Sequence, residues 1–435
     1  MYMGTFWRPV FLRLLPRSSV GLSGHLCSSL PMAAGMENVS SKHPMEDADE
    51  SDAKRQKVLL EGSQNDTSKT KAKAKKMAMC MTYNGKGYLG MQRNPGAKTI
   101  EEDLLQAMCR AQLLSQDQCD SPQSIMFQRA ARTDKGVSAV RQIVSLKLPT
   151  NISTETMVEN INKELGQNIR IVGIKRTTRG FNSKNNCDAR TYSYILPSFA
   201  FAQPEVPATP EYRISAERLE EVNRILSLYK GCHNFHNFTS GKKSDEASAM
   251  RYIITCECSE PFEQEGLEFL QIQLKGQSFM LHQIRKMVAM AIAIMRGCTS
   301  EATIRRAWGP EKLDIPIAPA LGLMLEEVHY ERYNQKYGGD GLHEALTWTE
   351  KQDMIHTFKK THIYPTIVET EKTEQSMLNW MENLQLHTYD VREAWTPPTT
   401  AAKENCEAED AVSATDVNGH SVEDDTLQNI ENETK

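Results

Sequence analysis

The chain has 435 residues, 39% of them hydrophobic, and a formal net charge of −5 at pH 7. Residues 1–76 hold 12 Lys and Arg against 8 Asp and Glu, and residues 401–435 hold 2 against 10. Subtracting both segments from the totals of 51 Lys and Arg and 56 Asp and Glu leaves 37 basic and 38 acidic residues for 77–400, so this central part is near neutral. This excludes a uniformly basic nucleic-acid-binding domain, and a nucleic-acid site would have to be a local patch. No apolar run is long enough to span a bilayer.

The N-terminal segment, residues 1–36, has the composition of a mitochondrial transit peptide. It contains several serines and no acidic residue, and its arginines are Arg8, Arg13 and Arg17. Translation from Met32 or Met36 would omit this segment and leave the basic run 69–76, which is typical of a nuclear address or an RNA-binding arm. We therefore expect forms in the mitochondrion and the nucleus. The alternative for both segments is a plain solvated tail.

Composition divides the chain into five parts. Residues 1–76 and the acidic segment 401–435 are predicted to be disordered, because they are polar and charged and hold few core-forming residues. Between them strands and helices interleave over an N-terminal lobe at 77–180, a C-terminal lobe at 181–335 and a helical extension at 336–400. This mixture predicts an α+β protein with a substantial sheet.

Elements of the first half follow from the spacing of apolar residues. The expected strands are 77–83, 143–148, 169–175 and 189–196. A helix is predicted at 99–114, where Thr99 and Glu102 have the spacing of a capping box. A second helix is predicted at 154–166 and ends at Gly166.

The second half shows the same alternation of helix and strand patterns. A helix at 215–231 has Ser215 as its candidate cap, and a long helix at 279–297 carries a broad apolar face. The expected strands are 251–258, 266–276 and 322–330. Two further helical patterns, near 343–360 and 370–388, predict a C-terminal module added to the core.

Ten cysteines are scattered without the paired spacing of a disulfide framework, which favours reduced thiols in an intracellular protein. Two clusters have residue types that can bind metals. They are Cys232, His233 and His236, and Cys256 with Cys258. Neither cluster matches a zinc-ligand spacing, so we expect no metal site.

The stretch RAARTDKGVSAVRQ, residues 129–142, places Asp134 among several basic residues. Strand-like sequences flank it, so the stretch is predicted to be a loop held on a sheet, a common position for catalytic residues. For an isolated Asp-Lys-Gly the alternative is a solvated turn with a surface salt bridge.

Five motifs occur in a fixed order, and together they are far more specific than any one alone. They are YNGKGYLGMQRN, RAARTDKGVSAVRQ, DARTYSYIL, FMLHQIRKMV and APALGLML. In these motifs the chain resembles the TruA family of tRNA pseudouridine synthases over about residues 79–330. The resemblance implies a pseudouridine synthase fold with two lobes around an antiparallel sheet and an RNA-binding cleft between them. It also implies that no cofactor is used.

The resemblance implies roles for four residues. Asp134 is the catalytic aspartate, Tyr192 the active-site tyrosine and Arg285 the basic partner of Asp134, while Arg132 enters the space that a flipped base vacates. Chemistry supports these roles. A carboxylate can attack or stabilise a sugar carbon as a glycosidic bond breaks, and a guanidinium would keep that carboxylate ionised. Tyr192 can stack on a base, whereas its hydroxyl with an ordinary pKa is a weak base.

Several basic residues together are expected to bind the phosphates of RNA. Each of them taken alone is more often a solvated charge. The candidates are Lys135, Arg129, Arg141, Lys184, Lys286, Lys242 and Lys243. The expected partner is tRNA, with the anticodon-stem region as target and with mRNA and small nuclear RNA as further substrates of a monomeric enzyme. Two departures from the family pattern affect RNA docking, namely Met91 in place of an aromatic residue and the long loop containing SQDQCDSPQS.

Two other functions remain open from the residues alone. The chain could hold or remodel tRNA without chemistry, or it could be a glycosidase-like hydrolase that releases the base. A retaining hydrolase needs two positioned carboxylates, and within the core motifs only Asp188 accompanies Asp134.

Overall fold

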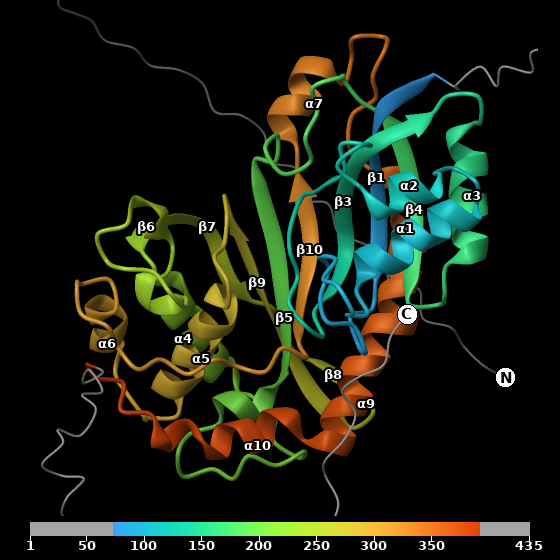
Figure 1. The fold of residues 1–435 in the computed structure, drawn as a ribbon. Helices are drawn as coiled ribbons and strands as arrows, with labels where there is room; N and C mark the ends of the chain where they lie inside the picture. Colours follow the sequence, from blue (N-terminus) through green and yellow to red (C-terminus); the bar gives the residue numbers. More distant parts are fainter. Residues whose placement is uncertain (1–72, 392–435) are drawn as a thin grey trace, which may run out of the picture. The chain divides into compact units, whose positions relative to one another are not determined.

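A computed structural model describes residues 73–391 of the chain. Within this range the strands form one ten-stranded sheet (Figure 1). Its main path runs in the order β4 (Ile169–Arg176), β1 (Ala74–Tyr83), β3 (Ser138–Pro149), β10 (Leu323–His329), β5 (Ala189–Pro197), β9 (Leu267–Gly276), β7 (Met250–Cys258) and β6 (Gly231–Asn234). Off this path, β2 (Gln128–Arg129) pairs with β3 and β8 (Phe262–Gln264) pairs with β9.

The sheet is mixed, which corrects the expectation of an antiparallel sheet. In β3 and β10, Ser138 and Ala139 pair in parallel with Met324 and Leu325, whereas every other strand pair recorded for residues 73–391 is antiparallel. The parallel pair arises because β10 returns from far along the chain and inserts between β3 and β5. It joins the two halves of the sheet at the strand that follows Asp134.

Helices pack on both halves of the sheet (Figure 1). Those of the first half are α1 (Ile100–Arg110), α2 (Gln116–Asp120) and α3 (Thr154–Glu164), and those of the second are α4 (Ala216–Ser227), α5 (Gln283–Met295) and α6 (Glu301–Arg306). At the start of α1 the Thr99 side chain accepts a hydrogen bond from the Glu102 backbone, as the capping-box spacing predicts. Every residue of α5 from Lys286 to Ala293 is buried, so this helix forms the centre of its half.

The C-terminal helices differ from their predicted bounds. They are α7 (Glu331–Tyr337), α8 (Gln352–Phe358), a π-helix at Lys359–Ile363, α9 (Tyr364–Glu374) and α10 (Ser376–Glu382). Short 3-10 helices lie at Ser198–Phe201, His236–Phe238, Ala247–Ala249, Thr349–Lys351 and Leu384–Leu386. The Lys359 ammonium donates to both carboxylate oxygens of Glu326 on β10, at 2.7 and 2.9 Å, and both side chains are largely buried. The extension is therefore fastened to the central strands.

Some predicted segments lie outside the described residues, namely the transit-like segment 1–36 and the acidic segment 401–435. The basic run 69–76 is described only from residue 73, and β1 begins at Ala74, before the predicted start of the fold at 77. No helix in the described range is long and apolar enough to cross a membrane.

Candidate active site

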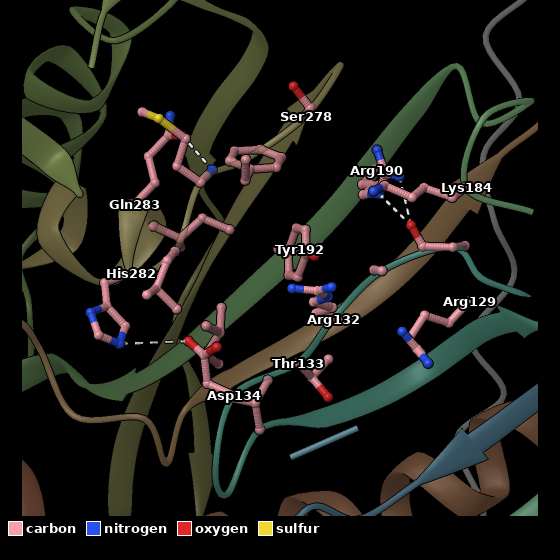
Figure 2. Close-up of a pocket in the computed structure, with 18 of the residues that line it drawn as sticks. Arg129, Arg132, Thr133, Asp134, Lys184, Arg190, Tyr192, Ser278, His282 and Gln283 are labelled. Atoms are coloured by element: carbon pink, nitrogen blue, oxygen red, sulfur yellow. Dashed lines mark hydrogen bonds and ion pairs between the residues drawn. The ribbon is translucent and has the colours of Figure 1, made fainter. Parts of the chain in front are cut away.

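A cavity of about 640 Å³ opens between two segments of chain (Figure 2). One is the aspartate loop, residues 129–137, which runs from β2 to β3 and carries Asp134. The other is the α5 entry loop, residues 277–284, which runs from β9 into α5. Tyr192 and Arg190 of β5 line the cavity between the two loops. The sheet order brings these parts together, because only β10 separates β3 from β5.

Hydrogen bonds from the β1–α1 segment hold the aspartate loop in place. The Thr133 carbonyl accepts from the Met91 backbone at 3.0 Å, and the Tyr88 carbonyl accepts from the Gly136 backbone at 3.2 Å. The hydroxyls of Tyr83 and Thr133 are hydrogen-bonded at 2.8 Å in a buried position. These bonds explain why the YNGKGYLGMQRN motif accompanies the aspartate motif, since the β1–α1 segment packs against the aspartate loop and holds it by hydrogen bonds.

Two further residues fix the backbone beside Asp134. Fully buried Gln142 accepts from the Ala131 backbone at 3.2 Å and donates to the Ala131 carbonyl at 2.9 Å. Gly90 has a left-handed φ of +103°, and a Cβ there would lie 2.7 Å from the Thr133 carbonyl oxygen. A larger residue at this position would displace the loop, so the glycine is required by close approach as well as by φ.

The Asp134 side chain is 30% exposed and lines the cavity. Its nearest recorded ionisable partner is His282 of the α5 entry loop, with 3.9 Å between His282 Nε2 and Asp134 Oδ2 (Figure 2). Arg285, the partner expected from the resemblance, instead donates through Nε to the Ala318 carbonyl at 2.6 Å. Within residues 73–391 no hydrogen bond or ion pair joins Arg285 to Asp134. Burial lowers the pKa of Arg285, and the charges of Tyr194 and Asp134 partly oppose that shift.

Tyr192 is 7% exposed and lines the cavity between the two loops. Its ring packs edge-to-face against Phe279 of the α5 entry loop, with 5.2 Å between the ring centroids. Burial raises the pKa of its phenol, and the charge of Arg190 opposes this only in part. The hydroxyl is therefore protonated at neutral pH, which suits stacking and leaves it a poor proton acceptor.

The sequence is similar to known proteins. The sequence pattern of a family described as tRNA pseudouridine synthase matches residues 225–331. A pseudouridylate synthase 1 homolog of Mus musculus is 51% identical over 334 residues, which cover 76% of this chain and 78% of the relative. The homolog of Homo sapiens is 52% identical over 331 residues, covering 75% and 77%. A tRNA pseudouridine synthase 1 of Yarrowia lipolytica is 34% identical, covering 68% and 72%.

The chain belongs to the TruA family of tRNA pseudouridine synthases. It is therefore an enzyme of the isomerase class, one that converts uridine in tRNA to pseudouridine. The predicted family is confirmed, and the mixed sheet with its helices is consistent with the pseudouridine synthase fold.

The synthase cavity is positively charged in its local surroundings, although the chain as a whole is not. Five of its lining residues are basic and one is acidic, apart from His282. The basic ones are Arg129, Arg132, Lys184, Arg190 and Arg251. Arg132 and Lys184 are exposed, and their side chains have no recorded hydrogen bond or ion pair to any other described residue. Both side chains are therefore accessible at the cavity, and their predicted contacts with RNA stay predictions.

Arg190 and Arg251 were not predicted as site residues. The Arg190 guanidinium donates twice to the Ala130 carbonyl, at 2.6 and 3.1 Å, and once to the Gln277 carbonyl at 3.1 Å, so it ties the two loops together. Its spacing of two from Tyr192 on a strand was a usable signal, because both side chains must share one face. Arg251 has a buried Nε without a hydrogen-bond partner among the described residues. No feature of its sequence surroundings marks it.

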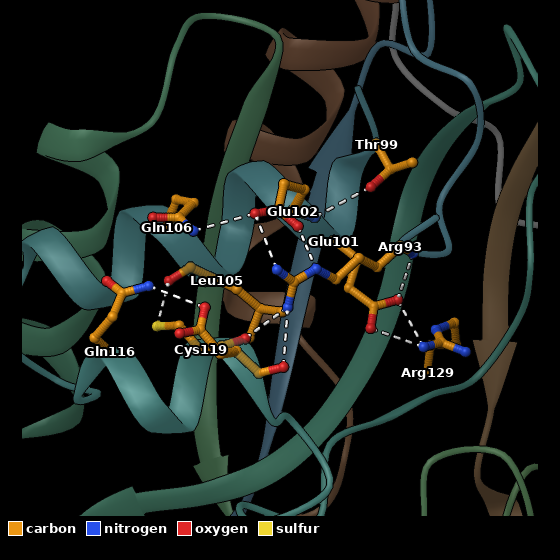
Figure 3. Close-up of polar contacts among 10 residues, drawn as sticks. Arg93, Thr99, Glu101, Glu102, Leu105, Gln106, Gln116, Cys119 and Arg129 are labelled. Carbon is orange, nitrogen blue, oxygen red and sulfur yellow. Dashed lines mark hydrogen bonds and ion pairs between the residues drawn. The ribbon is translucent and has the colours of Figure 1, made fainter. Parts of the chain in front are cut away.

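Arg129, which lines the cavity, forms an ion pair with the carboxylate of Glu101 on α1 (Figure 3). Its Nη2 lies 2.6 Å from Glu101 Oε2, and Glu101 is buried. The neighbouring Glu102 pairs with Arg93, whose Nη1 also donates to the Cys119 carbonyl at 2.7 Å. The network therefore joins the long SQDQCDSPQS insertion to the cavity wall through α1.

The remaining predicted phosphate contacts are not among the residues that line the cavity. Lys286 is 6% exposed and donates to the Asn237 carbonyl at 3.0 Å, so burial keeps it from a phosphate. Arg141 donates to Gln352 and does not line the cavity, and Lys242 pairs with Glu246. Lys135 is exposed and follows Asp134 in the chain, but it is not one of the residues that line the cavity.

The Cys and His side chains considered for metal binding do not come together as a set of ligands. Cys256 and Cys258 are buried in the core, and the His233 ring stacks on Trp308 with 3.9 Å between centroids. Among residues 73–391, no group of three or more His, Cys, Asp or Glu side chains could hold a metal ion.

Proposed function

We propose that this synthase uses the Asp134 carboxylate to isomerise uridines in the anticodon-stem region of tRNA, and that mRNA and small nuclear RNA are further substrates. The observation that carries the proposal is the position of Asp134. It is a partly exposed carboxylate on a loop fixed by several hydrogen bonds, at the wall of a cavity whose other charged residues are mostly basic. Such an arrangement suits a reaction in which positive charge develops on a bound, negatively charged polymer.

The reaction requires three changes at one nucleotide. The N1–C1′ bond breaks while the Asp134 carboxylate stabilises the electron-poor centre or bonds to it, and the freed uracil then turns. A C5–C1′ bond forms, and any bond from the carboxylate to the sugar breaks as it does so, which restores the free carboxylate. The proton then leaves C5, and N1 gains a proton, so that atoms balance without any co-reactant. Because burial keeps the Tyr192 phenol protonated, Tyr192 is assigned to holding the ring, and the proton passes to another acceptor.

Access to the uridine requires that the base leave its stack, which costs a few kcal/mol. Arg132 is exposed at the cavity, and its side chain has no recorded hydrogen bond or ion pair within the described residues, which supports a role in filling the space that the base vacates. Tyr192, packed on Phe279, offers a rigid aromatic surface, and stacking contributes roughly 1–3 kcal/mol per base. These two side chains together offset the cost of flipping.

Incubation with unmodified tRNA transcripts, followed by base-resolved mapping of pseudouridine, tests the proposal. We expect conversion at discrete uridines of the anticodon-stem region and no release of free uracil. Free uracil would support the hydrolase instead, and tight binding without conversion would support the non-catalytic tRNA-binding function. Gel filtration of the same preparation tests the proposed monomer, which a dimer mass would contradict.

Localisation to both mitochondrion and nucleus is a further proposal, supported by the acid-free, arginine-bearing residues 1–36 and the basic run 69–76. A reporter fused to residues 1–36 should enter mitochondria, and a chain starting at Met36 should accumulate in the nucleus. A cytosolic location for both would contradict it.

A further inference from the structure

We propose that His282 is a positioning residue that aims the Asp134 carboxylate through its Nε2–H group, whereas the family resemblance implies Arg285 as the partner of that carboxylate. This inference rests on the proposed role of Asp134. Three observations carry it, namely the approach of the His282 ring to Asp134, the strained backbone of His282 and the isolation of the second ring nitrogen.

The first observation is the contact itself. His282 Nε2 lies 3.9 Å from Asp134 Oδ2, across the cavity from the aspartate loop. No other ion pair of Asp134 is recorded within residues 73–391. The distance is too long for a hydrogen bond in the free enzyme, and such contacts commonly tighten when substrate closes a site. A uridine entering between the two loops would bring about that closure.

The second observation is the backbone of His282. Its φ of 61° and ψ of 2° are left-handed, a conformation that is uncommon for a residue with a side chain and that clusters at functional sites. Two hydrogen bonds hold the backbone of His282 in this conformation. The Lys286 backbone donates to the His282 carbonyl at 3.0 Å, and the Thr239 hydroxyl donates to the Leu281 carbonyl at 2.8 Å. Glycine would adopt this conformation without strain, so the presence of histidine indicates a use for the ring.

The third observation fixes the position of the proton. His282 Nδ1 is buried and has no hydrogen-bond partner among the described residues. A proton on Nδ1 would be unsatisfied, whereas a proton on Nε2 faces the Asp134 carboxylate, so the Nε2–H tautomer is favoured. Burial lowers the pKa of His282, with Arg285 and Lys286 of α5 acting in the same direction and Asp134 against it. The ring is therefore neutral at neutral pH and can orient the carboxylate without neutralising its charge.

His282→Gly separates this role from a structural one, because it removes the ring and relieves the left-handed strain. We expect tRNA affinity and melting temperature to be kept or raised, and the single-turnover rate to fall by about 10²-fold, the loss typical of a misaligned reacting group. His282→Asn tolerates the same backbone and keeps an N–H donor, so it should recover part of the rate. Gln112→Gly is the matched control, since Gln112 is also left-handed, at φ 57°, but exposed and outside the cavity lining.

The pH dependence of the single-turnover rate provides a readout that a structural role would not move. In the parent enzyme the rate should fall as the pH drops through the lowered pKa of His282. Below that pKa the ring is cationic, so it forms an ion pair that neutralises the charge of Asp134, and its buried Nδ1 carries a proton that has no acceptor. In His282→Gly that acid limb should move to lower pH. An unchanged rate and an unchanged pH profile in His282→Gly would overturn the inference. If Asp134→Asn also stays active, the proposed function fails with it; if Asp134→Asn is inactive, only the role of His282 fails.

Discussion

The two loops that enclose the cavity are built in different ways. The aspartate loop is bound on several sides, by Met91 and Tyr88 from the β1–α1 segment, by Tyr83 from β1 and by Gln142 from β3. Its conformation is therefore set by the core before any substrate arrives. A reacting group benefits from such a frame, because a preorganised carboxylate needs no rearrangement at the moment of reaction.

The α5 entry loop carries the opposite features. It contains a left-handed His282 with an isolated ring nitrogen, and Leu281 at its tip is 53% exposed. Arg190 is the bridge that ties it to the aspartate loop, through the carbonyls of Ala130 and Gln277. The core therefore holds the aspartate loop on several sides, whereas the α5 entry loop places a left-handed residue and an exposed side chain beside the cavity.

The largest effect is expected for Asp134→Asn, which removes the charge and keeps the size of the side chain. Pseudouridine formation should fall by many orders of magnitude, while tRNA binding stays nearly unchanged, because the phosphate contacts lie on other residues. Base-resolved mapping and filter binding on the same preparation measure the two properties. Conversion at more than a small fraction of the parent rate would show that Asp134 is not the catalytic aspartate.

A smaller but clear effect is expected for Gly90→Ala, which tests whether the frame of the aspartate loop matters. The new Cβ would lie 2.7 Å from the Thr133 carbonyl, and alanine must also adopt a φ of +103°. We expect the free energy of unfolding to fall by about 1–3 kcal/mol and the single-turnover rate to fall with it. Gly180→Ala is the control, since a Cβ there meets nothing within 4 Å and its φ is not left-handed. Equal stability and rate in both variants would contradict a rigid frame.

The smallest effect concerns affinity. The logarithm of tRNA affinity should fall steeply with the logarithm of salt concentration, and Lys184→Ala should reduce that slope by about one. Arg141→Ala should leave the slope unchanged, because Arg141 is engaged with Gln352 and lies outside the cavity lining. Titrations at several salt concentrations distinguish the two variants. Equal reductions in slope would show that RNA covers the Arg141 surface as well.

The sequence predicted the aspartate loop and the strand of Tyr192 better than the contacts at the start of α5. The aspartate loop and the strand of Tyr192 follow from local patterns, because a loop between strands and an alternating strand are properties of neighbouring residues. Arg285 and His282 lie three residues apart at the start of one helix, and spacing cannot decide which of them faces Asp134. In the structure His282 Nε2 lies 3.9 Å from Asp134 Oδ2 and Arg285 donates to the Ala318 carbonyl, and both contacts depend on tertiary packing.

The fold shows the same limit. Most strands and the helices α1, α3, α4 and α5 lie where the apolar spacing placed them. The parallel pairing of β3 with β10 could not be predicted, because no local pattern encodes which distant strand becomes a neighbour. The C-terminal helices were misplaced since their amphipathic pattern is weak, and their bounds are set instead by contacts such as that of Lys359 with Glu326.

Transfer RNA containing 5-fluorouridine tests most directly whether Asp134 performs the chemistry. Fluorine at C5 cannot leave as a proton, so the reaction stops after the early steps and isolates the part assigned to the carboxylate. We expect the parent enzyme to consume 5-fluorouridine at its target positions, measured as loss of that nucleoside after complete digestion. Asp134→Asn should leave it intact while still binding the RNA. Equal consumption by both proteins would contradict the account.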